Sequence, residues 1–129
     1  MKVSIAGIAV KDSLIFIARR CSGGAMDGKW EFPGGKADEG EGREEALIRE
    51  LWEEFGITVR VGKLLGESSF VHNEVRRELF AYQFFFPLDA PLKLTEHSEF
   101  RWADLKEIKQ LDFTPSDLTL LPFIEPLVS

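Results

Sequence analysis

The sequence is poor in cysteine, in long apolar runs and in positive charge, and each scarcity excludes a class of protein. Only one of its 129 residues is cysteine, Cys21, so no internal disulfide can form. No apolar run reaches the roughly 20 residues that a membrane-spanning helix needs. The first residues also lack the apolar core of a signal peptide. These features predict a cytoplasmic protein with no membrane partner.

Acidic residues outnumber basic ones by 22 to 16, which gives a net charge of −6 at pH 7. A negative charge disfavours nonspecific binding to nucleic acid, which is itself a polyanion. The excess is local, because residues 38–54 contain eight acidic and two basic side chains. This segment alone accounts for the net charge, and it directs attention to one short part of the chain.

The length and the apolar content of 44% are typical of a single globular domain, residues 1–129. Runs rich in β-branched and aromatic residues predict strands at residues 2–10, 13–19, 30–32, 57–65, 69–71, 78–86 and 100–102. Lys11 and Asp12 separate the first two strands as a hairpin turn. Strands that interleave with helices through short connections predict an α/β domain with a mixed sheet.

Three helices are predicted. The first covers residues 43–55, with Gly42 and Glu45 as capping partners and Gly56 as a left-handed C-cap. Its apolar residues recur at helical spacing, and they are Leu47, Ile48, Leu51, Trp52 and Phe55. A short helix follows at residues 103–110. A longer one starts at Thr114, and we expect Pro122 and Pro126 to bend it or end it early.

Glu50, Glu53 and Glu54 lie at positions i, i+3 and i+4 of the first helix, which places three carboxylates on one face. Oxygen ligands suit hard cations such as Mg²⁺ or Mn²⁺, and this helix has no histidine or cysteine that would favour zinc. The alternative is a solvated acidic face without a ligand.

Residues 35–57 read GKADEGEGREEALIRELWEEFGI. This segment resembles the Nudix box at all nine specified positions, which are Gly35, Glu41, Arg49, Glu50, Leu51, Glu53, Glu54, Gly56 and Ile57. The resemblance implies the Nudix fold, an α/β/α sandwich with a central mixed sheet. It also implies Mg²⁺-dependent hydrolysis of a nucleoside diphosphate linked to another moiety.

The same resemblance implies a role for each residue of the box. Glu50, Glu53 and Glu54 match the metal-binding and base carboxylates, and the Gly35 carbonyl matches a metal ligand. Arg49 matches the residue that orients the first of those glutamates. Glu41 matches an acid with a supporting role.

Further segments resemble the MutT-like nucleoside triphosphate pyrophosphohydrolases, namely residues 15–20, 30–35 and 111–117. Glu96 matches an additional metal-binding glutamate of that group, because it stands six residues before Trp102. By the same match Arg20 contacts the substrate phosphate or sugar, and Phe32 faces the base.

Asp117 stands where MutT has an asparagine that reads the edge of 8-oxoguanine. An ionised aspartate only accepts hydrogen bonds, so it favours a base that presents donors, such as the guanine N1–H and 2-amino edge or the cytosine amino group. It also resembles the aspartate of the CTP and modified-pyrimidine pyrophosphohydrolases. The alternative is a capping-box acid on the last helix.

The sequence therefore predicts a Mg²⁺-dependent enzyme, with Mn²⁺ as the alternative ion, that converts an oxidised or modified (d)NTP such as 8-oxo-dGTP to the monophosphate and pyrophosphate. This activity would cleanse the nucleotide pool from which DNA is made. CTP or a modified pyrimidine triphosphate is the alternative substrate, and a non-catalytic nucleotide sensor is the alternative function. We expect a monomer or a homodimer.

Other conspicuous residues are expected to have structural or surface roles. His97 and His72 are expected at the surface, because a lone histidine near a sheet edge is usually exposed. Trp52, Trp102 and the phenylalanines at 84–86 are expected in the core, because strands buried on both faces read as continuous apolar runs.

Overall fold

The computed structural model describes residues 2–21 and 28–128. The sequence indicates a glycine-rich loop at residues 21–29, and Gly23 and Gly24 of this loop lie outside the described ranges. The elements are β1 (Lys2–Ile8), β2 (Val10–Lys11), β3 (Leu14–Arg20), β4 (Trp30–Glu31), β5 (Gly34–Lys36), α1 (Arg43–Phe55), β6 (Arg60–His72), β7 (Val75–Phe85), β8 (His97–Ala103), α2 (Leu105–Gln110), α3 (Pro115–Leu118) and α4 (Leu121–Val128).

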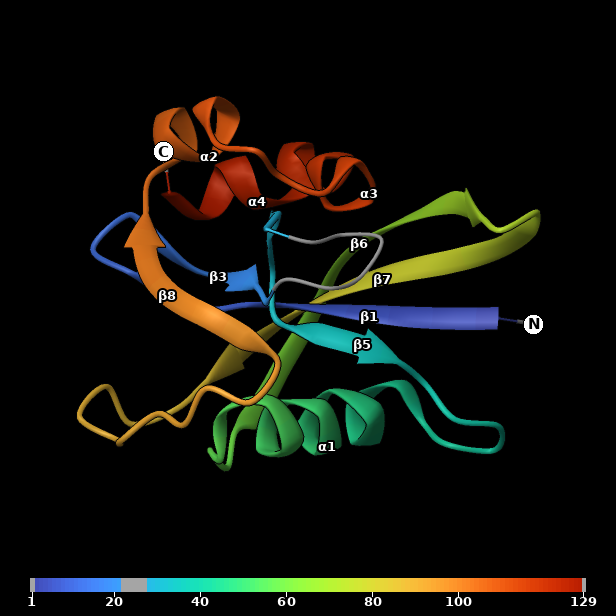
Figure 1. Cartoon of the computed structure of the whole chain (residues 1–129), viewed down its shortest axis with the longest axis horizontal. Coiled ribbons are helices and arrows are strands. Elements are labelled where there is room, and N and C mark those ends of the chain that lie inside the picture. Colours follow the sequence, from blue (N-terminus) through green and yellow to red (C-terminus); the bar gives the residue numbers. More distant parts are fainter. Residues whose placement is uncertain (1, 22–27, 129) are drawn as a thin grey trace.

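The strands form two sheets between two layers of helices (Figure 1). One sheet has the order β5-β1-β7-β6, in which β1 and β7 are parallel and the other pairs are antiparallel. In the second sheet β3 pairs with β2, β4 and β8. Helix α1 lies on one side of the strands, and α2, α3 and α4 lie on the other. The predicted α/β sandwich with a mixed sheet is confirmed.

Helix α1 has the predicted bounds and caps. Gly42 precedes it in an extended conformation and donates its N–H to the Glu45 side chain at 3.3 Å, and Gly56 ends it with φ of 68°. Its buried face consists of Ala46, Leu47, Leu51, Glu54 and Phe55. Trp52 lies about 100° round the helix from Leu51 and is 60% exposed, so its predicted place in the core is wrong.

The strand predictions needed three corrections. The first hairpin turns at Asp12 and Ser13, one residue later than predicted, because both adopt positive φ angles that suit a two-residue turn. The two strands predicted at residues 57–65 and 69–71 form the single strand β6. Its pairing with β7 shifts register on both sides of Leu64, and the strand continues beyond these irregularities. The third correction concerns the core: Phe85 is 40% exposed, on the side of β7 opposite its buried neighbour Phe84, so its predicted place in the core is wrong.

The helix predicted from Thr114 starts as expected, with Thr114 as N-cap and Pro115 in the first turn, but its predicted length is wrong because it forms as α3 and α4. The break falls at residues 119–120, before either proline. Pro122 occupies the first turn of α4, where a helix needs no N–H donor, and Pro126 lies inside α4. The short α3 is thereby set apart from α4, and it carries Asp117.

Gly34 permits the close approach of β5 to β1. Its φ of 144° is a conformation open almost only to glycine, and a Cβ there would overlap the Ile5 carbonyl oxygen. Gly35 then pairs with Ile5 in the antiparallel ladder. This backbone geometry sets the position of Gly35 beside α1.

We expect Gly34→Ala to lower the free energy of unfolding by at least about 3 kcal/mol, because the added Cβ meets backbone that cannot move aside. Gly40→Ala is the matched control. Gly40 also has a positive φ, but a Cβ there would meet nothing within 4 Å, so we expect a cost of about 1 kcal/mol. Urea unfolding of both variants measures the difference, and equal costs would contradict the steric argument.

Candidate active site

Arg49 holds the carboxylates of α1 in place. Its Nε and Nη2 donate to the two oxygens of Glu41 at 2.8 and 2.9 Å. Its Nη1 donates to Glu50 at 3.0 Å and to Glu53 at 3.1 Å. The hydrogen bond from Arg49 lowers the pKa of Glu41 to about 2. Arg49 thus fixes Glu50 from α1 and Glu41 from the preceding loop in one arrangement.

Glu50, which is half-buried and lies next to Gly35, forms a pair of neighbouring carboxyl groups with the buried Glu54. A Cβ on Gly35 would lie 2.5 Å from the Glu50 carboxyl carbon, so Glu50 rests directly on this glycine. Glu54 is only 1% exposed, and neither of its oxygens has a hydrogen-bond partner among the described residues. Burial raises the pKa of Glu54 to about 11 and also raises that of Glu50. A bound cation would favour the ionised form of both groups.

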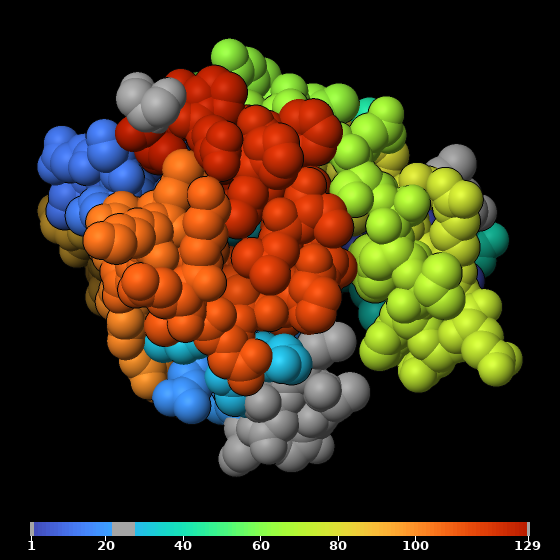
Figure 2. Space-filling view, turned by 90° about the horizontal axis from the view of Figure 1, so that it is seen from above, coloured from blue at the N-terminus to red at the C-terminus, as the bar shows by residue number. Residues whose placement is uncertain are grey.

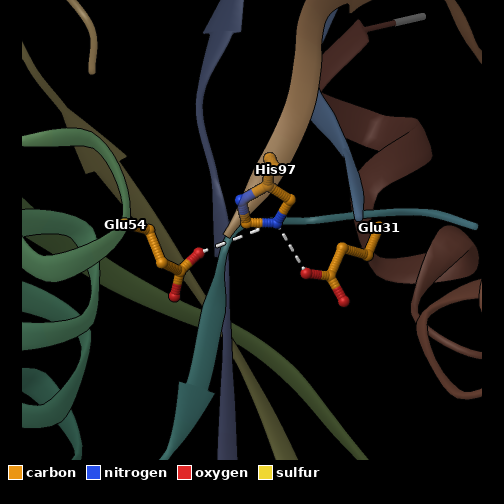
Figure 3. A group of neighbouring side chains, drawn as sticks. All are labelled: Glu31, Glu54 and His97. Atoms are coloured by element: carbon orange, nitrogen blue, oxygen red, sulfur yellow. Dashed lines mark hydrogen bonds and ion pairs between the residues drawn. The ribbon is translucent and has the colours of Figure 1, made fainter. Parts of the chain in front are cut away.

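His97 extends this site beyond the acidic helix (Figure 3). Its Nε2 lies 2.8 Å from Glu31 Oε2 and 4.0 Å from Glu54 Oε1. Its ring stacks on Phe55 with centroids 5.1 Å apart. The expectation that His97 lies at the surface is wrong, because its side chain is enclosed between α1 and β4.

Glu31, Glu54 and His97 offer ligand atoms that all lie within 4.8 Å of one another, so the group could hold a metal ion. Sequence reasoning did not select Glu31 or His97. The sequence offered one signal for them. Glu31 directly precedes Phe32 and His97 directly follows Glu96, and both of these neighbours are predicted site residues.

A cavity of about 480 Å³ brings most of the predicted site residues together. Those that line it are Arg20, Phe32, Gly35, Glu50, Glu96 and Asp117. In Figure 2 the surface is hollowed between the α2–α4 layer and the β6–β7 hairpin. The other predicted residues do not line this cavity. Glu54 is buried beside Glu50, and the Glu53 side chain is 52% exposed against Arg49.

Asp117 does not cap its own helix. Its Oδ2 accepts the Phe32 N–H at 2.9 Å, while the Thr114 N–H donates to the Trp30 carbonyl, also at 2.9 Å. The capping-box alternative is therefore wrong. Burial, together with the charge of Glu31, raises the pKa of Asp117 to about 7. A carboxyl group with this pKa is partly protonated at neutral pH, so it can donate a hydrogen bond as well as accept one.

Arg20 and Phe32 also line this cavity. Arg20 pairs with Glu31 at 3.3 Å, and its side chain is partly exposed. The Phe32 ring packs edge-on against Phe113, with centroids 5.0 Å apart. The cavity thus has carboxylates at one end and an aromatic ring with a carboxyl group at the other. This is an arrangement suited to a metal-bound phosphate and an aromatic base.

Comparison with known proteins agrees with this geometry. A model of the NUDIX domain matches residues 1–123, so the chain belongs to the Nudix family. It is a Nudix hydrolase, an enzyme that acts on phosphoric anhydride bonds.

Among the described residues, no helix is long and apolar enough to cross a membrane.

Two curated relatives match most of the chain. The CTP pyrophosphohydrolase of Escherichia coli is 32% identical over 118 residues, covering 91% of this chain and 86% of the relative. A putative 8-oxo-dGTP diphosphatase 2 of Mycobacterium tuberculosis is 30% identical over 119 residues, covering 90% of this chain and 82% of the relative.

Two solved structures share the fold closely. The solution structure of the E. coli ORF135 protein has a TM-score of 0.83 at 31% identity and covers 98% of this chain and 90% of its own. The crystal structure of a MutT protein from Methanosarcina mazei has a TM-score of 0.82 at 28% identity, with coverages of 97% and 91%.

We expect Glu54→Gln to stabilise the metal-free protein at pH 8 by at least about 1 kcal/mol. The folded pKa of about 11 exceeds the ordinary 4.5, so the proton favours folding below pH 4.5, and this contribution is lost as the pH rises toward 11. Glutamine keeps the neutral shape at every pH. Urea unfolding in EDTA at pH 6 and pH 8 measures the effect. Glu53→Gln, at a half-exposed position of the same helix, should change stability little, and equal effects would contradict the burial argument.

Proposed function

We propose that this protein hydrolyses nucleoside triphosphates with an oxidised or modified base to the monophosphate and pyrophosphate. The observation that carries the proposal is the buried Glu54 carboxyl group, which has no hydrogen-bond partner among the described residues and lies beside Glu50. Glu50 lines the cavity together with Phe32 and Asp117. A polyphosphate would lie beside Glu50, and an aromatic base would lie beside Phe32 and Asp117.

The residues at the carboxylate end fit Mg²⁺, with Mn²⁺ as the alternative ion. The Gly35 carbonyl and the carboxylates of Glu50, Glu54 and Glu96 form an all-oxygen donor set, which hard cations prefer. The unpartnered oxygens of Glu54 support this fit, because a buried carboxylate without a counter-charge is costly. When bound, the ion supplies neutralisation of the phosphate charge and polarisation of the scissile phosphoric anhydride.

The chain's own residues orient the reactants and move the proton. Arg49 holds Glu50 and Glu53 at fixed positions. One of the three box carboxylates takes the proton of the water that attacks phosphorus, and the anhydride bond to the leaving pyrophosphate breaks. Arg20 contacts the phosphate or sugar, and Phe32 faces the base.

The substrates we propose are 8-oxo-dGTP and related oxidised nucleotides, with CTP or a modified pyrimidine triphosphate as the alternative. Relatives of nearly equal identity are named for each activity. Hydrolysis of damaged triphosphates would keep them out of DNA. A non-catalytic nucleotide sensor is the less favoured function, because a sensor does not need the full set of box carboxylates.

We expect the purified protein with Mg²⁺ to release pyrophosphate from a panel that includes 8-oxo-dGTP, dGTP and CTP. Glu53→Gln should lower kcat by at least about 10²-fold with the fold intact, as expected for a metal-binding or base carboxylate. Glu44→Gln, an acid in the first turn of the same helix and outside the specified box positions, should retain wild-type kcat. No turnover anywhere in the panel would refute catalysis, and a wild-type rate for Glu53→Gln would remove Glu53 from the machinery.

We expect Asp117→Asn to change the ratio of kcat/KM between bases more than it changes the Mg²⁺ dependence. Because the pKa of Asp117 is about 7, its proton is gained or lost between pH 6 and pH 8, and the wild-type ratio should vary over this range. An asparagine does not titrate, so the variant's ratio should stay constant. Steady-state kinetics at pH 6, 7 and 8 measure both effects. Identical ratios in both proteins would exclude Asp117 from base recognition.

A further inference from the structure

Arg77 is a buried guanidinium without a counter-charge. It lies on β7 and is 8% exposed. Its Nε donates to Ser4 Oγ at 2.9 Å and its Nη2 donates to the Val3 carbonyl at 3.0 Å, both neutral acceptors. Within residues 2–21 and 28–128, no carboxylate forms an ion pair with Arg77 and no acceptor bonds its Nη1.

This position does not need an arginine for packing. Along β7, Leu79 and Ala81 follow Arg77 on the same face and belong to the apolar core beneath α2–α4. An apolar residue at position 77 would continue that core, whereas an unpaired buried charge is costly to desolvate. The presence of a buried arginine that lowers the stability of the free protein is explained if the arginine binds a ligand.

Arg77 lines the nucleotide cavity, away from its carboxylate end. The sheet order β5-β1-β7-β6 places β7 two strands, or about 10 Å, from the Gly35 strand. Phe70 and His72 of β6 line the cavity beside Arg77, and Asp117 lines it from α3, which covers this face of the sheet. Arg77 is therefore placed toward the base and not toward metal-bound phosphates.

We propose that Arg77 is a base-reading residue whose free N–H groups donate to a carbonyl oxygen of the base, while Asp117 contacts another edge. This inference rests on the proposed nucleotide hydrolysis and deepens it. A guanidinium has donors only, so it pairs with an acceptor such as a carbonyl oxygen and finds no partner in a C–H edge. The substrate class is thus nucleotides with a carbonyl on the edge that faces β7. The C8 carbonyl of 8-oxoguanine, which guanine lacks, is the sharpest example.

Arg77→Met tests the proposal, with Arg76→Met as the matched control. Arg76 is the neighbouring residue on the exposed side of β7, where it pairs with Glu78. We expect Arg77→Met to lower kcat/KM by about 10- to 100-fold for 8-oxo-dGTP and by less than about 3-fold for dATP, whose base has no carbonyl. Arg76→Met should match the wild type on both nucleotides.

Two further measurements separate this role from a structural one and from the proposed catalysis. The thermal midpoint of free Arg77→Met should equal or exceed that of the wild type, because a buried unpaired charge is removed. Calorimetric titration with 8-oxo-dGMP needs no turnover, and the variant should bind it about 10- to 100-fold more weakly.

Three results would overturn the base-reading role. A uniform loss of kcat/KM for every base would make Arg77 a phosphate or sugar contact. A lowered thermal midpoint together with equal losses of kcat/KM for all nucleotides would make Arg77 a structural residue. Equal 8-oxo-dGMP binding by wild type and variant would also overturn it, whereas an inactive wild type would refute only the proposed hydrolysis.

Discussion

The rest of the site depends on the Arg49 guanidinium, because it allows like charges to remain close together on one helix. Glu50 and Glu53 would repel each other along α1, and Arg49 donates to both while its other edge binds Glu41. It also donates to the Lys36 carbonyl, which joins α1 to β5. Helix α1, strand β5 and the loop that carries Glu41 are thereby fixed relative to one another. Glu54 receives none of this help, and its buried oxygens have no hydrogen-bond partner among the described residues.

Features that depend on neighbours in the chain could be predicted from the sequence. The bounds of α1 follow from its apolar spacing and from the glycines at 42 and 56, which are local signals. The box residues share one helix and one loop, so their spacing sets their relative positions. Features that depend on distant segments could not be predicted in this way. Trp52 has helical spacing like Leu51, but only the packing of α1 on the sheet decides that Trp52 faces outward.

The buried histidine illustrates the same limit within the site. His97 and Glu31 are 66 residues apart, and β8 and β4 both pair with β3, which brings these two side chains within 2.8 Å of each other. A lone histidine in the sequence carries no sign of such a partner. Arg77 and Ser4 are likewise 73 residues apart and meet through the parallel pairing of β7 with β1. Sheet topology, a non-local property, therefore completes the cavity that the local motif begins.

Two buried groups at the site lack a partner that the free protein could supply. Burial raises the pKa of Glu54 to about 11, so this carboxyl group is held protonated beside Glu50, and Arg77 in the cavity has only neutral partners among the described residues. Folding alone would favour apolar residues at both positions. Under the proposed function, a nucleotide with its cation would let Glu54 ionise and would give Arg77 a carbonyl acceptor on the base. Metal and base recognition would then each strengthen the other.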